Sequence, residues 1–226
     1  ISIEFGDNKG DPKEGVNIMQ KLINVNSVKL FYVDLTAVAL TCTPIAESNK
    51  VIMFAGSTHP TITEGNKWSF RVFTSGAQEA DILCNYLIKK GVKAVYLLHV
   101  DDSLGLDSKK VFEAKFTSQG GKLVGIDSFK SVDQEFKSLL TKVKSKSFDK
   151  LVIIDYGIAL PNILKQADEI GVPSQKIAGN IGFVGPGVIK LDASLKEGAI
   201  FTGPAFTYRF MSNTPTESMK GFIQEY

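Results

Sequence analysis

Two almost wholly apolar stretches, "AVYLLHV" (residues 94–100) and "LVIID" (residues 151–155), most constrain what this chain can fold into. Neither stretch alternates apolar and polar side chains, as a strand with one face in water would. Continuous apolar strands are typical of parallel sheets that helices cover on both faces. Each stretch leads into a segment with helical spacing, at residues 104–121 and 159–171. This order predicts βα units and a doubly wound α/β fold.

The same alternation of strand and helix runs along the rest of the chain. "ISIEFGD", residues 1–7, alternates apolar and polar side chains and is predicted to be a strand. Residues 179–187, "GNIGFVGPG", are predicted to form a loop because they combine glycines with a proline, and a short helix is predicted to follow "QKIAGNIG", residues 175–182. Further strands are predicted at residues 28–34, 51–56, 68–73, 122–129 and 198–206, and further helices at residues 11–24, 36–48, 76–90 and 133–146.

Composition bounds the class of protein. The chain has 226 residues, of which 43% are hydrophobic and 22% charged, so it is long enough for one large or two small globular domains. Its 26 basic and 24 acidic residues give a net charge of +2, which gives no reason to expect a nucleic-acid partner. It contains no apolar run of membrane-spanning length. Because it opens without Met, it is interpreted as an excerpt from a longer protein.

Residues that could carry catalysis or bind a metal are few. The two histidines and two cysteines lack metal-ligand spacing, and no phosphate-binding loop or nucleophile elbow occurs. Cys42 and Cys84 are predicted to be buried free thiols in helices. Asp101 and Asp102 follow an apolar strand and could hold Mg²⁺, but an acidic pair there more often caps the next helix. We therefore expect no enzyme, no cofactor and no metal site.

The ends of the strands carry the polar residues. "AGSTHP", residues 55–60, places small and hydroxylic residues directly after a hydrophobic strand. In open α/β sheets, ligands bind beyond the carboxyl ends of the strands. This loop is therefore either part of a ligand site or a simple tight turn. "DYG", residues 155–157, allows the same two interpretations, a site or a helix cap with a turn.

A set of segments, taken in order, resembles one protein family. They include "ALTCTPIAESNKVIMFAGSTHPTIT", "FRVFTSGAQEADILCNYL", "VDDSLGLDSKKVFEAKFTSQGGKLVG" and "LPNILKQADEIGV". They resemble the type I periplasmic binding proteins, the branched-chain amino-acid (Leu/Ile/Val-binding) family of ABC transporter substrate-binding proteins. The resemblance implies two Rossmann-like lobes with parallel sheets, joined by crossing strands, with the ligand clamped between them.

The resemblance also implies how the lobes divide the chain. Residues 1–73 would be part of lobe one, residues 74–204 lobe two, and residues 205–226 a return to lobe one. The first crossing strand would be "WSFRVF" and the second "FTGPAFTY". Lobe one would be incomplete, because the family's opening strand and helix have no counterpart in this chain.

Ligand-binding positions follow from the same resemblance. Leu104 stands where the family often has a tyrosine, and Ile181 where amino-acid-binding members have an acidic residue. The expected ligand thus has a polar or carboxylate head and an apolar body without an ammonium group, unless Asp34, Asp101 or Asp155 takes the acid's role. It would be an aromatic or aliphatic carboxylate or an amide-like solute. The implied ligand-binding residues are Leu35, Thr36, Gly56, Ser57, Thr58, Leu104, Tyr156 and Ile181.

The resemblance implies a periplasmic or cell-surface solute-binding protein, exported and working with the membrane subunits of an ABC importer. Two alternatives stay open. One is the ligand-sensing domain of a membrane receptor, and the other is a true branched-chain amino-acid binder.

Overall fold

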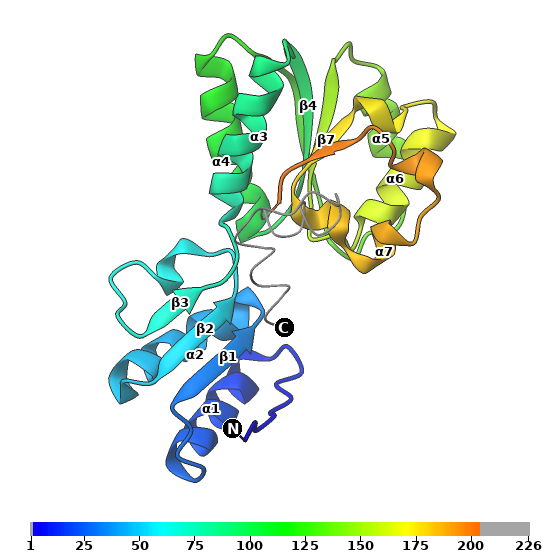
Figure 1. The fold of residues 1–226 in the computed structure, drawn as a ribbon. Helices are drawn as coiled ribbons and strands as arrows, with labels where there is room; N and C mark the ends of the chain where they lie inside the picture. The colour runs from blue at the N-terminus through cyan, green and yellow to red at the C-terminus, as the bar shows by residue number, and fades with distance from the viewer. Residues whose placement is uncertain (1, 204–226) are drawn as a thin grey trace, which may run out of the picture. The chain divides into compact units, whose positions relative to one another are not determined.

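The computed structural model describes residues 2–203, which form two compact units separated after Ser75. Each unit has a parallel β-sheet of its own (Figure 1). The first unit ends at Ser75, just after the predicted first crossing strand at residues 68–73. Most of the second predicted crossing and all of residues 205–226 lie outside the described residues. None of the described helices is long and apolar enough to span a membrane.

The first unit, up to Ser75, contains a three-stranded parallel sheet in the order β1-β2-β3. Helix α1 begins where Asp11 caps it, since the Asp11 carboxylate accepts from the backbone N–H groups of Lys13 (2.8 Å) and Glu14 (3.0 Å). The elements are α1 (Pro12–Asn24), β1 (Leu30–Asp34), α2 (Thr36–Asn49), β2 (Ile52–Gly56), a 3₁₀ turn (Pro60–Ile62) and β3 (Ser69–Arg71).

The core of the first unit lies on one face of its sheet. Strands β1 and β2 alternate exposed and buried side chains, so Phe31, Val33 and Met53 point into the core. Helices α1 and α2 cover that face and pack together so tightly that a Cβ on Gly15 would lie 2.4 Å from Val38 Cγ1. The side chains on the opposite face are exposed.

The second unit, from Gly76, contains a five-stranded parallel sheet in the order β5-β4-β6-β7-β8. Helices α3 and α4 lie on one side of this sheet and α5 and α6 on the other (Figure 1). The elements are α3 (Gly76–Lys89), β4 (Ala94–Val100), α4 (Ser103–Ser118), β5 (Lys122–Phe129), α5 (Lys137–Lys144), β6 (Lys150–Ile154), α6 (Leu160–Glu169), β7 (Ile177–Gly179), α7 (Pro186–Ile189) and β8 (Ile200–Phe201), with 3₁₀ turns at Ser174–Lys176, Ile181–Val184 and Ala193–Leu195. The predicted doubly wound α/β fold is confirmed.

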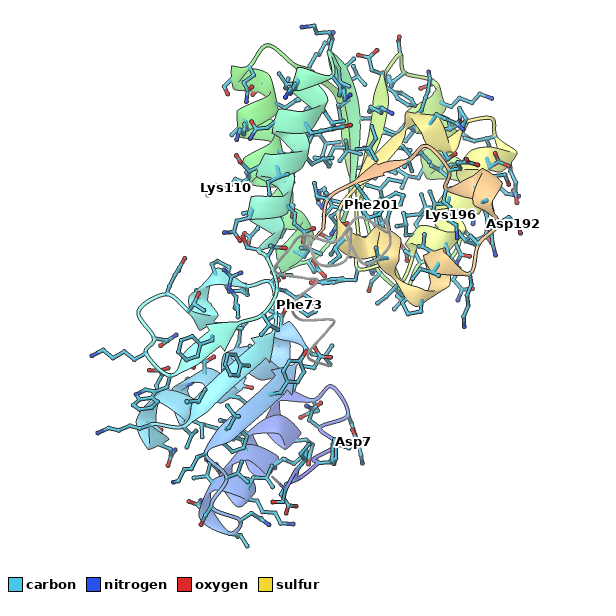
Figure 2. All side chains as sticks on the ribbon, in the orientation of Figure 1. Asp7, Phe73, Lys110, Asp192, Lys196 and Phe201 are labelled. Carbon is cyan, nitrogen blue, oxygen red and sulfur yellow. The ribbon has the colours of Figure 1, made fainter. Side chains whose placement is uncertain are left out.

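The core of the second unit lies on both faces of its sheet. Leu97 and Leu98 of β4 and Val152 and Ile153 of β6 are all fully buried although neighbouring side chains point to opposite faces. This confirms the inference drawn from the continuous apolar stretches. Both cysteines are free and buried, in α2 and α3, as predicted (Figure 2 shows all described side chains).

Two sequence predictions were wrong. Residues 2–7 form no strand, because within the described residues no other strand hydrogen-bonds to them. Residues 179–187 are not a simple loop. They contain the 3₁₀ turn Ile181–Val184, which begins with a hydrogen bond from Phe183 N to Asn180 O (3.3 Å). The short helix predicted after residue 182 is confirmed as α7. Glycine and proline disfavour long helices, but short turns tolerate both.

Candidate functional site

In the first unit, the loops that follow β1 and β2 lie side by side, because Asp34 is paired with Gly56 across the parallel sheet. The hydroxyl of Ser57 donates to Thr36 Oγ1 at 3.0 Å and accepts from the backbone N–H of His59 at 3.1 Å. Ser57 is buried, whereas Thr36 and Thr58 are partly exposed. Hydroxyl-bearing residues predicted from two separate segments thus meet at one edge of the sheet.

Gly56 is constrained by its own unit. A Cβ at this position would lie 2.4 Å from Asp34 Oδ1 and 2.6 Å from the Tyr32 hydroxyl. A side chain at residue 56 would displace both groups. The small residue at the end of β2 is therefore explained by packing within the sheet edge, whether or not a ligand also approaches its backbone.

Leu35 has an unusual backbone conformation at the same edge. Its φ of 68° is positive, which is uncommon for a residue with a branched side chain. A hydrogen bond from Leu35 N to Asp34 Oδ1 (2.9 Å) supports this conformation. Its side chain is exposed and gives the edge an apolar surface. Backbone strain of this kind is found disproportionately at ligand-binding sites.

Arg71, at the end of β3, brings a positive charge to this edge. Its Nη1 donates to the backbone carbonyl of Thr58 at 3.0 Å, while its Nε is buried and has no hydrogen-bond partner among the described residues. The sequence analysis missed this residue. The signal in the sequence was the predicted strand "WSFRVF", which contains Arg71. As the third strand of the same parallel sheet, it has its carboxyl end at the same edge as those of β1 and β2.

In the second unit, Asp102 and Tyr156 lie together after β4 and β6. Asp102 Oδ1 accepts from Gly105 N (3.2 Å) and caps α4, which confirms the cap predicted for the acidic pair. The Tyr156 hydroxyl hydrogen-bonds to Asp102. Burial, and then the charge and hydrogen bond of Asp102, raise the pKa of Tyr156 well above its usual value. The ring of Tyr156 stays partly exposed.

Asp155 is fully buried at the end of β6. Its Oδ2 accepts from the backbone N–H groups of Gly157 (2.9 Å) and Leu160 (3.0 Å), which supports the interpretation of "DYG" as a helix cap with a turn. Burial raises the pKa of the Asp155 carboxyl, and the backbone hydrogen bonds oppose part of that effect. Asn180, from the next strand, accepts from Asp155 N at 3.2 Å.

Ile181 and Leu104 take different positions in the second unit. The backbone N–H of Ile181 donates to Glu79 Oε2 at 3.0 Å, and Glu79 is buried in the first turn of α3. The sequence gave no local signal for this contact, since the two residues are 102 positions apart. Leu104 is buried against α3, where a Cβ on Gly76 would lie 2.5 Å from Leu104 Cδ1.

Metal-binding chemistry is not supported at either edge. Among residues 2–203, no three His, Cys, Asp or Glu side chains gather closely enough to hold a metal ion. The two edges instead present hydroxyls, backbone N–H groups, one guanidinium and a phenol. Such groups can hold a small polar molecule through hydrogen bonds.

Comparison with known proteins decides the family. The profile of a family described as "Periplasmic binding protein" matches residues 1–226. The chain belongs to this family. It is 26% identical to Leu/Ile/Val-binding protein homolog 3 of Brucella melitensis over 184 residues, covering 79% of this chain and 50% of that protein. It is 25% identical to Leu/Ile/Val-binding protein homolog 2 of Brucella abortus over 214 residues, covering 90% and 56%. The chain thus spans about half the length of the curated relatives it matches.

Solved structures share the type I fold. The substrate-binding protein LivJ of Streptococcus pneumoniae, in complex with isoleucine, matches with a TM-score of 0.78 and 22% identity over 94% of this chain and 66% of that one. An extracellular ligand-binding receptor of Rhodopseudomonas palustris HaA2 matches with a TM-score of 0.81 and 22% identity, over 95% of this chain and 60% of that one. A solute-binding protein of R. palustris, in complex with 4-hydroxybenzoate, matches with a TM-score of 0.70 and 19% identity, over 77% of this chain and 49% of that one. The family is one of binding proteins and not of enzymes.

Proposed function

We propose that this periplasmic binding protein is the ligand-binding part of an exported solute-binding protein that serves an ABC importer. Its ligand would have a polar or carboxylate head and an apolar body and would lack an ammonium group. The observation that carries this proposal is the edge of the first unit, where the Thr36–Ser57 hydroxyl pair lies near Thr58 and the guanidinium of Arg71.

The head of the ligand would bind at this edge through hydrogen bonds and charge. Backbone N–H groups and hydroxyls at the end of a strand suit an anion. Arg71 adds a permanent positive charge, and its Nε lacks a partner within the described residues. A carboxylate placed here would gain charge-assisted hydrogen bonds, which are roughly twice as strong as neutral ones. Leu35, whose side chain is exposed at the same edge, would supply apolar contact with the body.

The acidic groups at the edge of the second unit argue against an ammonium group. Asp102 already accepts from Gly105 N and from Tyr156. Asp155 is fully buried, and its Oδ2 already accepts from the backbone N–H groups of Gly157 and Leu160. A buried ammonium without an ionised partner costs several kcal/mol. A neutral or anionic ligand avoids that cost.

The test is a calorimetric titration of the whole chain with matched pairs of ligands. We expect 3-(4-hydroxyphenyl)propanoate and 4-methyl-2-oxopentanoate to bind at least about tenfold more tightly than tyrosine and leucine, a difference of about 1.4 kcal/mol. Replacing the carboxylate by a primary amide, as in 4-hydroxybenzamide, should weaken binding. Saturable binding of leucine alone would contradict the proposed ligand class, although not the family.

A branched-chain amino acid is a second candidate, which the contact between Glu79 and Ile181 N favours. Glu79 places a carboxylate beside Ile181, the position at which amino-acid-binding members of the family have an acidic residue. If leucine binds, Glu79→Gln should abolish that binding and leave the binding of 4-hydroxybenzoate unchanged. Equal binding of leucine by the variant would exclude Glu79 as the partner of the ammonium.

A further inference from the structure

Four adjacent strands of the second unit each begin with a lysine or directly after one. Lys93 directly precedes β4, Lys122 opens β5, Lys150 opens β6 and Lys176 directly precedes β7. These strands are parallel and adjacent in the order β5-β4-β6-β7. Their amino ends therefore lie together at one edge of the sheet, opposite the carboxyl edge that carries Tyr156.

This basic edge consists of residues 89–93, 118–122, 144–150 and 168–176, which lead into the four strands. It contains eight lysines: Lys89, Lys90, Lys93, Lys122, Lys144, Lys146, Lys150 and Lys176. It contains three acidic residues, Asp149, Asp168 and Glu169. The whole chain has a net charge of only +2, so positive charge is concentrated at this edge.

Carboxylates do not neutralise these lysines. Within the described part of the chain, the three ion pairs involve other lysines. The ammonium group of Lys150 donates instead to the backbone carbonyl of Gln175, and that of Lys176 lies 5.3 Å from the centroid of the Phe148 ring. Contacts of this kind hold a positive charge in place without cancelling it.

The helix dipole explains only part of this charge. Lys89 and Lys144 lie in the last turns of α3 and α5, where a cation interacts favourably with the dipole. Lys93, Lys122 and Lys146 lie outside the helices and are exposed. Among residues 2–203, no hydrogen bond or ion pair holds the ammonium groups of these three. They are accessible to a partner.

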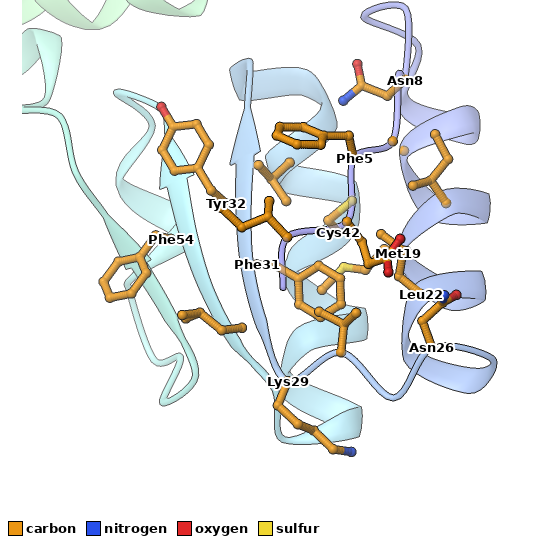
Figure 3. Close-up of a pocket in the computed structure, with 18 of the residues that line it drawn as sticks. Phe5, Asn8, Met19, Leu22, Asn26, Lys29, Phe31, Tyr32, Cys42 and Phe54 are labelled. Carbon is orange, nitrogen blue, oxygen red and sulfur yellow. The ribbon is translucent and has the colours of Figure 1, made fainter. Parts of the chain in front are cut away.

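The lysines of the basic edge are spread out and do not converge. In the first unit, by contrast, Phe5, Met19 and Leu22 are among the side chains that converge around a cavity of about 850 Å³ (Figure 3). Neighbouring strands lie about 4.8 Å apart, so the row of lysines from β5 to β7 extends over about 14 Å. A small anion binds where several donors reach one point. A row of this length fits an extended anionic surface.

The chemistry of the basic edge is that of charge alone. The large apolar residues of its segments, Val92, Phe148 and Val172, are buried. Protein interfaces have an apolar and aromatic core, which this edge does not offer in the described residues. Its cations are all lysines, which act as point charges on flexible stems, and none is an arginine with a planar group for bidentate recognition. The headgroups of anionic lipids attract such clusters of lysines.

We propose that the basic edge binds electrostatically to a membrane surface rich in anionic phospholipid. Each lysine close to such a surface strengthens binding by about fivefold at most, and salt weakens the attraction. The carboxyl edge of the second unit, at the other end of the strands, would face away from the lipid. The choice of a membrane rests on the proposed function, which puts the chain beside an importer.

The test measures how much of the whole chain sediments with lipid vesicles. Vesicles of phosphatidylcholine alone are compared with vesicles that contain about 30% phosphatidylglycerol, at about 0.05 M and about 0.5 M salt. The assay contains no solute ligand and no importer. A failure here therefore leaves the proposed function untouched, and a failure to bind a solute leaves this inference untouched.

Two triple variants locate the binding surface. The first carries Lys93→Gln, Lys122→Gln and Lys146→Gln in the basic edge. The matched control lowers the net charge by the same amount outside that edge, with Lys→Gln changes at three other exposed lysines of the second unit: Lys110, Lys165 and Lys190. All six side chains are on the surface, and thermal denaturation verifies that both variants fold as the unchanged chain does.

We expect the unchanged chain to bind the anionic vesicles at least about tenfold more tightly than the neutral ones at low salt, and to lose this preference at high salt. The basic-edge variant should bind the anionic vesicles at least about tenfold more weakly than the unchanged chain. The control variant should bind less than about threefold more weakly, since its lysines lie away from the lipid.

Three results would overturn the proposal. One is equal binding of anionic and neutral vesicles by the unchanged chain at low salt. Another is equal weakening in the two triple variants, which would mean that net charge and not the basic edge governs binding. The third is tighter binding to polyglutamate than to anionic vesicles with the same dependence on Lys93, Lys122 and Lys146, which would make an acidic protein the partner.

Discussion

The two units use similar strands but cover them differently. The second unit has helices on both faces of its sheet, and its central strands are completely buried. The first unit has helices on one face only, and every second side chain of β1 is exposed. The difference shows that the apolar character of a strand does not by itself bury it. Burial depends on which other elements of the chain lie over it.

The largest difference between the units should appear in core truncations. Leu98→Ala, in β4, should lower the free energy of unfolding of the second unit by about 2–5 kcal/mol, because it leaves a cavity in a core packed from both sides. The matched change Leu30→Ala, in β1, should cost less than about 1 kcal/mol, since Leu30 is 60% exposed. Urea-dependent hydrogen exchange resolves the two units. Equal losses would show that the exposed face of the first unit's sheet is covered in solution.

Glycines with positive φ should also differ between the units. Gly157, in the second unit, has φ 89°, and a Cβ there would lie 2.6 Å from the carbonyl oxygen of Gly182. Gly65, in the first unit, has φ 75° with no atom within 4 Å of such a Cβ. Gly65→Ala should cost about 1–2 kcal/mol from the backbone alone. Gly157→Ala should cost about 1 kcal/mol more than that, because a backbone oxygen must also move.

Thermal denaturation of the two glycine variants provides the measurement. A smaller loss for Gly157→Ala than for Gly65→Ala would mean that the turn at residues 155–157 is held less tightly than its contacts with Gly182 indicate.

Ligand binding should depend on different groups in the two units. Thr58→Val keeps the shape of the side chain and removes the hydroxyl of a residue whose backbone carbonyl accepts from Arg71, so binding of 4-hydroxybenzoate should weaken by about 1–3 kcal/mol. Tyr156→Phe removes a hydroxyl that already bonds to Asp102 and should weaken binding by less than about 1 kcal/mol. Calorimetry of both variants gives the comparison. A larger effect of Tyr156→Phe would place the head of the ligand at the second unit.

The smallest predicted effect is a dependence of stability on pH. In the second unit, hydrogen bonds from the backbone N–H groups of Lys93 (2.8 Å) and Ala94 (2.9 Å) hold the pKa of Asp149 below its usual value. A lowered pKa means that the unfolded chain binds the proton more readily. The stabilisation is therefore complete above pH about 4 and is lost as the pH falls through the pKa of the folded state.

Because Asp149 is exposed, water screens this effect and we expect less than about 1 kcal/mol. Asp149→Asn should make the free energy of unfolding of the second unit depend less on pH below about pH 4, as measured by urea unfolding. In the first unit, Glu47→Gln is the matched change. Burial raises the pKa of Glu47, but hydrogen bonds from Lys67 N, Trp68 N and Ser69 outweigh it. If the free energy of unfolding depends on pH in both variants as it does in the unchanged chain, other carboxyl groups determine the loss of stability in acid.

The sequence by itself determined the fold class, because a strand or a helix is encoded by periodicity within a few neighbouring residues. The same local encoding placed Asp102 as a helix cap and the two cysteines in buried helix positions. It also located the strand ends that carry Thr36, Ser57 and Thr58. These predictions needed no knowledge of which strands are neighbours.

Only the tertiary structure decided which of these residues meet. The hydroxyls of Ser57 and Thr36 bond because β1 and β2 are adjacent in one sheet, and Glu79 reaches Ile181 N because α3 lies beside the end of β7. Residues 2–7 alternate as a strand should, but a strand needs a partner for its backbone groups, and that partner is not encoded in the strand itself. Contacts between distant segments depend on strand order and connection handedness, which no local pattern of side chains specifies.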